Sequence, residues 1–299
     1  MGDQPALTCY VDPESYEREE NNDERFDRQV LAFGRQGQET IESLTVGIVG
    51  LGGTGSAVAQ QLAYLGVKRY VLIDPDLIET TNLNRVLGAT ATDVGRPKVE
   101  VAAEAIRRVS PGASINAVCD TAVLHSVIRN LINVDVFFGC TDSHGSRAVM
   151  SQFAYQYFVP CIDMGVQIDA KDGRIEHITG RIQMVGPGLP CLICADLLDP
   201  EQVRRDLMTD AERRLDPYIV GSAVTQPSVV SLNSTVASLA VTMFLGAATG
   251  LPNRARHQIV RFESGVVRAV AGEQVPDCVV CSKAGALGRG DDWNLPGRL

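Results

Sequence analysis

The sequence predicts an α/β protein built on a Rossmann-like, mostly parallel sheet with helices on both faces, a C-terminal antiparallel extension and a zinc knuckle. Three features support this prediction. A β-branched run at 44–49 leads through a glycine-rich turn into an apolar helix pattern at 56–65, which is the strand–turn–helix order of a nucleotide-binding unit. Strand and helix patterns then alternate to about residue 164, as is typical of a parallel sheet. Two Cys-x-x-Cys pairs follow.

The composition excludes some classes of partner. The 299 residues suffice for one large α/β domain or two small ones, and 45% of them are apolar, enough for a full core. A net charge of −9 argues against a nucleic-acid partner, which normally meets a basic face. The longest apolar helix pattern, 229–248, contains six Ser, Thr and Asn residues, so it predicts a buried helix and no membrane partner. No charged-then-apolar leader starts the chain, so we expect a cytoplasmic protein.

Three regions are expected along the chain. Residues 1–22 form an acidic N-terminal arm, and residues 286–299 form a flexible tail rich in glycine and charge. Residues 23–285 form the functional domain. Its nucleotide-binding half covers about 23–165, and its crossover and zinc-containing half covers about 166–285.

The first turn has the features of a phosphate site. It holds Gly50, Gly52, Gly53 and Gly55. Glycines let the backbone approach a phosphate closely, and the following helix supplies free N–H groups and a positive dipole end.

The second strand, 70–73, ends at Asp74, whose carboxylate could hold ribose hydroxyls. Arg85 and Lys98 follow soon after. An ordinary dinucleotide fold does not need two cations there, whereas a site that neutralises a triphosphate does. The two cations therefore favour a nucleoside triphosphate over an ordinary dinucleotide.

Further elements complete the nucleotide-binding half. We expect helices at 98–109, 125–131 and 145–158, and strands at 114–118, 134–140 and 160–164. Asp142 comes just after the continuous apolar strand at 134–140. A carboxylate at the end of a central strand lies where open α/β sheets bind ligands, but it could equally be the cap of the next helix.

The pattern changes after residue 164. Residues 174–185 predict a pair of antiparallel strands, and 196–220 predict a long crossover segment. Strands are also expected at 259–262 and 266–270. Ahead of the first strand, one or two short helices carry Arg25 and Arg28 on one face, and an isolated pair of this kind is usually solvated.

The eight cysteines favour metal or thiol chemistry over disulfides, because no secretory leader is seen. Cys191/Cys194 and Cys278/Cys281 form two Cys-x-x-Cys pairs. One pair alone could be a redox dithiol, but four thiolates suit a structural zinc ion. Cys9, Cys119, Cys140 and Cys161 are isolated.

Taken together, these motifs resemble the ThiF/MoeB/HesA family of adenylyltransferases, which are related to ubiquitin-activating enzymes. The resemblance covers 25–281. It depends on both cysteine pairs and on RFDRQ at 25–29, GLGGTG at 50–55, LIDPD at 72–76, NLNR at 82–85, GRPK at 95–98 and GCTD at 139–142. Each motif is common, but all of them in this order are very specific.

The resemblance implies a ThiF-type adenylation domain that binds ATP with Mg²⁺ and also holds Zn²⁺. Such enzymes join AMP to the C-terminal carboxylate of a small ubiquitin-fold or sulfur-carrier protein, release pyrophosphate and act as homodimers. It implies that Gly53 approaches the phosphates and Asp74 holds the ribose, while Arg25 reaches the partner's ATP. Asn82, Arg85 and Lys98 would bind phosphates and Asp142 would hold magnesium. The implied nucleotide-binding set also includes Gly50, Gly52, Gly55, Asp76, Asn84 and Ser143, and the implied catalytic residues are Arg25, Arg85, Lys98 and Asp142.

One departure from the family pattern concerns thioester chemistry. Related enzymes that form a thioester carry a cysteine in the crossover segment, whereas no cysteine lies between Cys194 and Cys278 here. We therefore expect the acyl adenylate itself to be the product, passed to sulfide, a thiol or another protein. A thiol elsewhere, such as Cys161 or Cys9, is the alternative.

Three other functions stay open at this stage. A peptide C-terminus, as in peptide-antibiotic members of the family, is an alternative substrate. A nicotinamide-dependent oxidoreductase would explain the glycine turn but leave Arg85, Lys98 and the cysteine pairs unexplained. A non-catalytic scaffold with this fold usually lacks the phosphate-binding cations, which are present here.

Overall fold

The computed structural model describes residues 23–171, 174–215 and 227–298. The acidic arm expected at 1–22 lies outside the described residues, as does the end of the expected crossover segment, from residue 216 onward.

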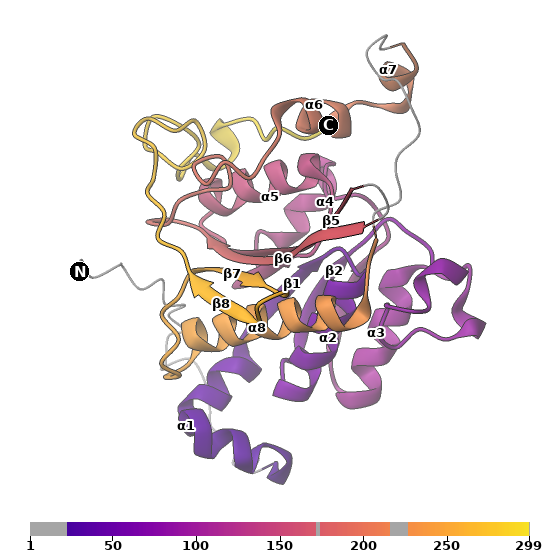
Figure 1. The fold of residues 1–299 in the computed structure, drawn as a ribbon. Coiled ribbons are helices and arrows are strands. Elements are labelled where there is room, and N and C mark those ends of the chain that lie inside the picture. The colour runs from indigo at the N-terminus through magenta and orange to yellow at the C-terminus, as the bar shows by residue number, and fades with distance from the viewer. Residues whose placement is uncertain (1–22, 172–173, 216–226, 299) are drawn as a thin grey trace.

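One mixed sheet of eight strands runs through the described residues in the order β3-β2-β1-β4-β5-β6-β7-β8 (Figure 1). Neighbouring strands are parallel from β3 to β5 and antiparallel from β5 to β8. This confirms the predicted Rossmann-like sheet and its C-terminal antiparallel extension. The strands are β1 Thr45–Val49, β2 Arg69–Ile73, β3 Ser114–Val118, β4 Val136–Gly139, β5 Cys161–Lys171, β6 Arg174–Val185, β7 His257–Arg261 and β8 Val266–Ala269.

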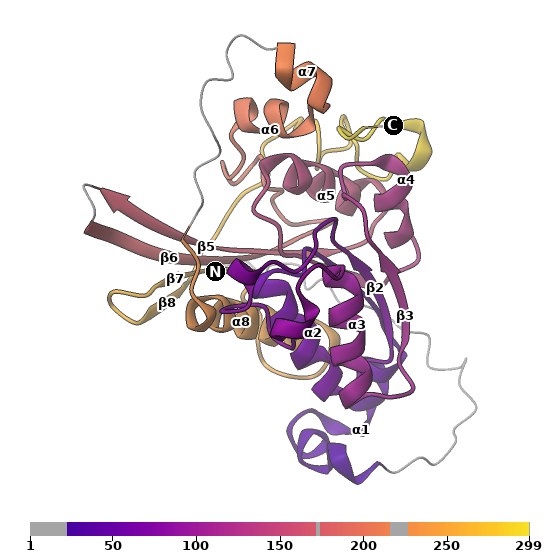
Figure 2. The same ribbon diagram turned by 90° about the vertical axis from the view of Figure 1, so that its right-hand side faces the viewer.

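Helices cover both faces of the sheet (Figures 1 and 2). One apolar core joins α2, α3 and α8 to one face, and a second joins α4, α5 and the cysteine loops to the other. The α-helices are α1 Asp27–Ser43, α2 Gly53–Leu65, α3 Lys98–Val109, α4 His125–Ile128, α5 His144–Gln156, α6 Pro200–Leu207, α7 Asp210–Leu215 and α8 Val230–Ala248. Short 3₁₀ turns are η2 Glu24–Phe26, η3 Thr80–Asn82, η4 Ala91–Asp93, η5 Arg129–Leu131 and η6 Gly290–Asp292.

The central strands are buried on both sides, which explains their continuous apolar sequence. In β1, Val46 and Ile48 belong to the core under α2, while Val49 belongs to the core under α5. In β4, Phe138 belongs to the core under α2 and Phe137 to the core under α5. Alternate side chains of a strand point to opposite faces, so a β-branched or aromatic residue suits every position.

Helix α8 is, by length and composition alone, apolar enough to cross a membrane. In the structure it packs against α2 and the sheet, with Val236, Ala240 and Phe244 buried in the same core as β1. Its exposed side carries Thr235, whose hydroxyl donates to the backbone carbonyl of Ser231. This arrangement is that of the core helix expected from the sequence.

The prediction of two antiparallel strands within 174–185 was wrong. Arg174–Val185 is the single strand β6, and it pairs along its length with β5, which continues to Lys171. Within this strand Gly180 lies against α8, where an added Cβ would be 2.5 Å from Val236. It marks a close approach of helix and strand.

The prediction of a flexible tail at 286–299 was also wrong for its described part. Leu295 is buried, and Arg298 pairs with Leu124 as an isolated β-bridge. Gln152 and Gln156 of α5 are buried, and their amides donate to the carbonyls of Asn294 and Trp293. Buried amides need hydrogen-bond partners. Hydrogen bonds from α5 therefore hold the tail in place, which the composition of the tail does not predict.

Replacing Leu295 with alanine should therefore lower the free energy of unfolding by about 2–4 kcal/mol, through lost burial and a residual cavity. Val267→Ala is the matched control, because Val267 is half exposed and its loss should cost under about 1 kcal/mol. Urea unfolding of both variants measures the difference. Equal effects would mean that the tail does not pack as described.

Candidate functional site

The candidate site lies where the strand order reverses, between the carboxyl ends of β1 and β4. Open α/β sheets bind ligands at such a switch point. Gly50 follows β1 with a φ of +87°, and its N–H donates to Ile73 of β2 at 2.8 Å. Cys140 follows β4 and donates to Val49 at 2.8 Å. The two turns therefore begin side by side.

The glycines of the first turn have different surroundings. A Cβ on Gly55 would lie 1.8 Å from the carbonyl oxygen of Gly50, so this helix turn packs directly on the end of β1. A Cβ on Gly53 would lie 2.1 Å from the amide of Asn233 in α8. A Cβ on Gly52 would meet no atom within 4 Å in the part of the chain that the structure describes. The open approach to the N-terminus of α2 is thus at Gly52, whereas Gly53, the glycine expected nearest to phosphate, faces α8.

Asp74 ends β2 and organises the same turn. It is 4% exposed, and its two carboxylate oxygens accept from the backbone N–H groups of Leu51, at 2.5 Å, and Asp76, at 2.9 Å. Burial raises the pKa of this carboxyl, and the charge of Lys98 opposes that rise. Each oxygen keeps a second lone pair for a ligand hydroxyl.

Lys98 is brought back to β2 by a closed loop. Ile78 and Arg96 share a backbone hydrogen bond, and Leu77 bridges Pro97. The ammonium group of Lys98 then lies 2.7 Å from a carboxylate oxygen of Asp76 and is only 10% exposed. Asp76, expected in the nucleotide-binding set, therefore holds the lysine in place at the strand end.

Arg85 lies on the same loop. Its guanidinium donates to the carbonyl of Thr81 at 2.6 Å and to the side chain of Asn84 at 3.3 Å. Two residues further on, the N–H of Leu87 donates to the hydroxyl of Ser56 in the first turn of α2. The loop that carries Arg85 thus touches the helix that follows the glycine turn.

Asn82 and Asn84, the two expected asparagines, differ in burial. Asn82 is buried, and its side chain accepts from the backbone N–H of Glu79 as part of a capping box around η3. Asn84 is exposed and contacts Arg85. Asn82 therefore shapes the loop, whereas Asn84 supports the guanidinium of Arg85 from the exposed side.

Asp142 follows β4 and is exposed. The cap of α5 is its neighbour Ser143, whose hydroxyl accepts from the N–H of Ser146. Ser143 also donates to Asp206 of α6 at 2.9 Å, and the N–H of Gly145 donates to the same oxygen. Of the two roles considered for Asp142, the capping role is thus filled by Ser143.

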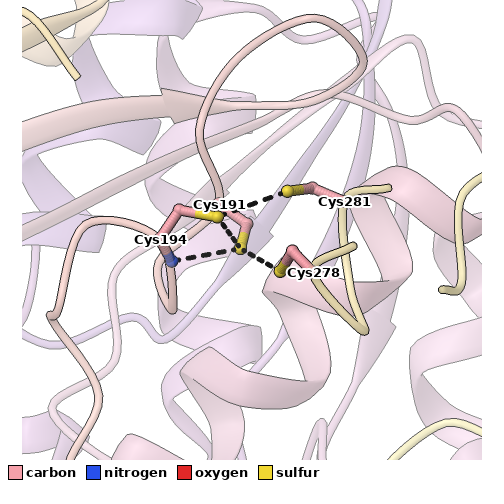
Figure 3. Close-up of side chains that lie close together, drawn as sticks. All are labelled: Cys191, Cys194, Cys278 and Cys281. Atoms are coloured by element: carbon pink, nitrogen blue, oxygen red, sulfur yellow. Dashed lines mark hydrogen bonds between the residues drawn. The ribbon is translucent and has the colours of Figure 1, made fainter. Parts of the chain in front are cut away.

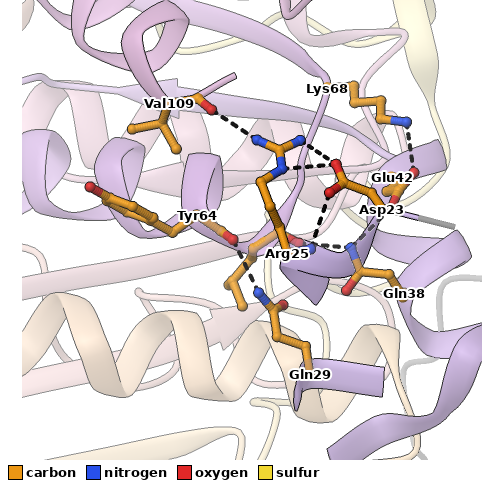
Figure 4. A network of polar contacts seen from close by, with 9 residues as sticks. Asp23, Arg25, Gln29, Gln38, Glu42, Tyr64, Lys68 and Val109 are labelled. Atoms are coloured by element: carbon orange, nitrogen blue, oxygen red, sulfur yellow. Dashed lines mark hydrogen bonds and ion pairs between the residues drawn. The ribbon is translucent and has the colours of Figure 1, made fainter. Parts of the chain in front are cut away.

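The expected Arg25 lies far from this edge of the sheet in its own chain. Figure 4 shows its guanidinium held by Asp23 and by the carbonyl of Val109, at 3.2 Å. Val109 ends α3, whereas Lys98 begins it. A helix of 12 residues is about 18 Å long. Arg25 is therefore separated from its own chain's Lys98 by the length of α3.

The isolated thiols fall into two groups. Cys140 and Cys161 are enclosed, and burial raises the pKa of both well above that of a free cysteine. Cys119 is exposed, and burial and nearby carboxylates raise its pKa. Cys9 lies outside the described residues. None of the three described thiols is activated as a nucleophile, because the thiolate is the reactive form.

The four cysteines of the two Cys-x-x-Cys pairs converge (Figure 3). Their sulfur atoms all lie within 4.8 Å of one another. The separations are 3.6 Å for Cys191 and Cys194, 3.7 Å for Cys191 and Cys278, and 3.4 Å for Cys194 and Cys281. Tetrahedral zinc with Zn–S bonds of 2.3 Å requires sulfur separations of about 3.8 Å. The cluster therefore fits zinc and is too open for a disulfide.

The surroundings of the cluster also suit thiolates. The N–H of Val275 donates to the sulfur of Cys194 at 3.2 Å, and the N–H of Cys194 donates to that of Cys191. The hydrogen bond between Cys191 and Cys281 lowers the pKa of Cys281 and raises that of Cys191. Four protein ligands leave no open position for a substrate, so the metal would be structural. It would join the loop after β6 to the segment after β8.

A buried charge cluster beside this edge was missed by the sequence analysis. Asp163 of β5 is 1% exposed and binds Arg147 of α5 and Arg181 of β6. The three residues belong to no quoted motif, and they come together only because α5 packs on the sheet and β5 pairs with β6. The alternation of β6, which places Arg181 and Gln183 on one face, was the available signal.

Comparison with protein families gives one match over most of the chain. A model described as the ThiF family matches residues 26–279. Its bounds contain the glycine turn, the Lys98 loop and the first three cysteines of the candidate zinc site.

Individual relatives are similar to parts or to nearly all of the chain. Molybdopterin-synthase adenylyltransferase from Escherichia coli is 34% identical over 179 residues, which cover 58% of this chain and 68% of that protein. Ubiquitin-like modifier-activating enzyme 5 from Bombyx mori is 26% identical over 298 residues, covering 89% and 73%. The crystal structure of E. coli MccB with AMPCPP and MccA superposes with a TM-score of 0.67 at 21% identity, covering 88% of this chain and 75% of that one.

Removing one ligand of the cluster should release the metal and destabilise the protein, because structural zinc contributes directly to folding. We expect about one zinc per chain, and for Cys281→Ser a melting temperature lower by roughly 10 °C. Elemental analysis and thermal unfolding measure the two quantities. Cys119→Ser, which removes an exposed thiol outside the cluster, should change neither. A metal-free wild-type protein with an unchanged melting temperature in Cys281→Ser would contradict the zinc assignment.

Proposed function

This chain belongs to the ThiF family, and from that premise we propose that it adenylates the C-terminal carboxylate of a small ubiquitin-like or sulfur-carrier protein. It is an adenylyltransferase, as the names of its relatives indicate. The products would be an acyl adenylate and pyrophosphate.

One observation carries the proposal: an uncapped helix N-terminus and a preorganised lysine lie at the same switch point. No side chain caps α2, and Gly52 leaves its approach open. Lys98 is held at the end of the neighbouring strand by Asp76. Backbone N–H groups and a fixed cation are what a polyphosphate needs. A nicotinamide enzyme would leave the lysine and Arg85 without a role.

Each of these residues is proposed to bind a different part of ATP or to support a residue that does. Asp74 would hold the ribose, the backbone at Gly52 the phosphates, and Arg85 and Lys98 the charge of the pyrophosphate leaving group. Asn82 would shape the loop and Asn84 support Arg85. Asp142, which is exposed and does not cap α5, would hold magnesium, whose charge assists the departure of pyrophosphate.

The chemical step then needs charge neutralisation and alignment, and no general base. A carboxylate is already ionised at neutral pH. Its oxygen forms a bond to the α-phosphorus as the bond from phosphorus to the bridging oxygen of pyrophosphate breaks. Because both reactants are anions, fixed cations and correct positioning supply the rate acceleration.

Arg25 is proposed to act on the ATP of a partner subunit in a two-fold symmetric homodimer. Its position at the far end of α3 argues against action within its own chain, and its side chain is 58% exposed. An isologous dimer would place the two copies of Arg25 in equivalent positions.

The acyl adenylate is proposed to be handed to an outside nucleophile without a crossover thioester. The sequence has no cysteine between Cys194 and Cys278, and Cys161 is buried with a raised pKa. The acceptor would be sulfide, a thiol or another protein. We place this chemistry in the cytoplasm, where ATP is available. A peptide C-terminus is the second candidate substrate, supported by the fold shared with MccB.

Substrate-dependent ATP–pyrophosphate exchange tests the proposal. We expect exchange with a carrier protein or peptide, and a loss of about 10²–10³-fold in rate for Lys98→Ala and for Arg85→Ala, since each removes a charge at the leaving group. Arg107→Ala, which removes an exposed arginine of α3, should keep the wild-type rate. Full exchange in both site variants would show that these cations do not bind the phosphates. A carrier protein that supports exchange where peptides do not would favour the first candidate.

Mixing inactive subunits tests the role of Arg25. Arg25→Ala and Lys98→Ala chains should each be inactive alone. Their heterodimer should contain one intact site, giving about half of the wild-type rate per dimer if the sites are independent. Heterodimers shown by native mass spectrometry to form, yet without activity, would mean that Arg25 does not act in trans.

A further inference from the structure

The charge cluster of Arg147, Asp163 and Arg181 holds more positive than negative charge. Arg147 donates through Nε and Nη2 to the two oxygens of Asp163, both at 3.1 Å. Arg181 donates to one of the same oxygens through Nη2. The side chains of the two arginines are only 14% and 13% exposed. Two guanidinium groups thus share one carboxylate in a largely buried place.

The excess charge has no fixed counter-charge. Nη1 of Arg181 is buried and has no hydrogen-bond partner within the described parts of the chain. Asp142 acts electrostatically on Arg147, but it is exposed and forms no ion pair with it among the residues described. An unpaired buried charge is unfavourable, so a cluster of this kind is suited to an anion that arrives from outside.

The cluster opens at the edge of the sheet that carries the nucleotide site. Gly139 pairs with Asp163 at the end of β4, and β5 continues past that point to Gly165, which pairs with Arg181. Gly165 is half-buried, and among the described residues a Cβ placed on it would meet one heavy atom within 4 Å, Nη2 of Arg147 at 3.4 Å. We name this open space, bounded by Gly165 and Arg147 and backed by Arg181, the Gly165 cradle.

We propose that the Gly165 cradle binds the terminal carboxylate of the substrate, with Arg147 in contact and Arg181 as a positioning residue behind it. This inference rests on the proposed adenylation and deepens it. A carboxylate carries one negative charge, which balances the single excess positive charge of the cluster. The cradle lies two strands from β1, about 10 Å along the sheet edge at 4.8 Å per strand. At that separation the phosphates can bind at the Gly52 turn while the carboxylate binds in the cradle.

Bromide in crystals of the wild-type protein provides a probe that needs no substrate. The expected result is an anomalous peak over Gly165 beside Arg147. Gly165→Ala fills the space with one methyl group at an ordinary contact distance, so it should fold normally and lose the peak. Gly112→Ala, at an open turn after α3, is the matched control and should keep it. No wild-type peak in the cradle, or a peak that survives in Gly165→Ala, would overturn the inference.

A second experiment measures whether the cradle prefers a substrate with a charged C-terminus. The substrate found by pyrophosphate exchange is compared with the same molecule carrying a C-terminal amide, by binding in the presence of AMPCPP. Wild-type protein should prefer the acid by about tenfold or more, the value of a hydrogen bond to a charged group. Arg181→Met leaves Asp163 paired with Arg147 and removes the excess charge, so the preference should fall to within about threefold. Arg181→Lys should restore it in part.

The controls separate this inference from the proposed function. Arg107→Met removes an exposed charge and should keep the wild-type preference for the acid. Binding of AMPCPP alone should be the same in wild type and Arg181→Met. An unchanged preference in Arg181→Met would overturn the role of the cradle. If no carrier or peptide supports exchange, the proposed function fails, and the bromide experiment still decides whether the cradle is an anion site.

Discussion

The contact between the first turn of α2 and the end of β1 is the constraint on which the rest of the site depends. A Cβ on Gly55 would overlap the carbonyl oxygen of Gly50, so only glycine lets the helix start this close to the strand. That approach brings the free N–H groups of α2 to the edge of the sheet and places Ser56 where the Lys98 loop can bond to it. The neighbouring turn after β4 then lies within reach of the same crevice.

The charged side chains at this edge of the sheet are held in position without a ligand. Lys98 is almost buried and is held by Asp76, so little reorganisation is needed when phosphates replace or share that carboxylate. On the other side of β4, the Asp163 cluster keeps two guanidinium groups fixed against the sheet. The four-cysteine cluster joins the loop after β6 to the segment after β8, so a metal bound there would close the part of the chain from α6 to β8, which includes α8.

The sequence was most informative where chemistry depends on local order. The strand, the glycine turn and α2 are consecutive, and Asp74 follows directly from the end of β2, so pattern and motif sufficed to predict them. The convergence of the four cysteines was predictable because Cys-x-x-Cys pairs carry their own spacing. In contrast, the Asp163 cluster needs the register of β5 against β6, and the ordered tail needs the buried amides of Gln152 and Gln156. Such non-local pairings leave no periodic signal.

The most direct test of this account is a crystal structure of the protein with AMPCPP and magnesium. The account predicts the triphosphate at the Gly52 turn with Lys98 and Arg85 on its oxygens, the ribose on Asp74, and the metal beside Asp142. Arg25 of the partner subunit should reach the same nucleotide. A nucleotide bound elsewhere, or bound at the turn with Lys98 still paired to Asp76 and distant from phosphate, would contradict it.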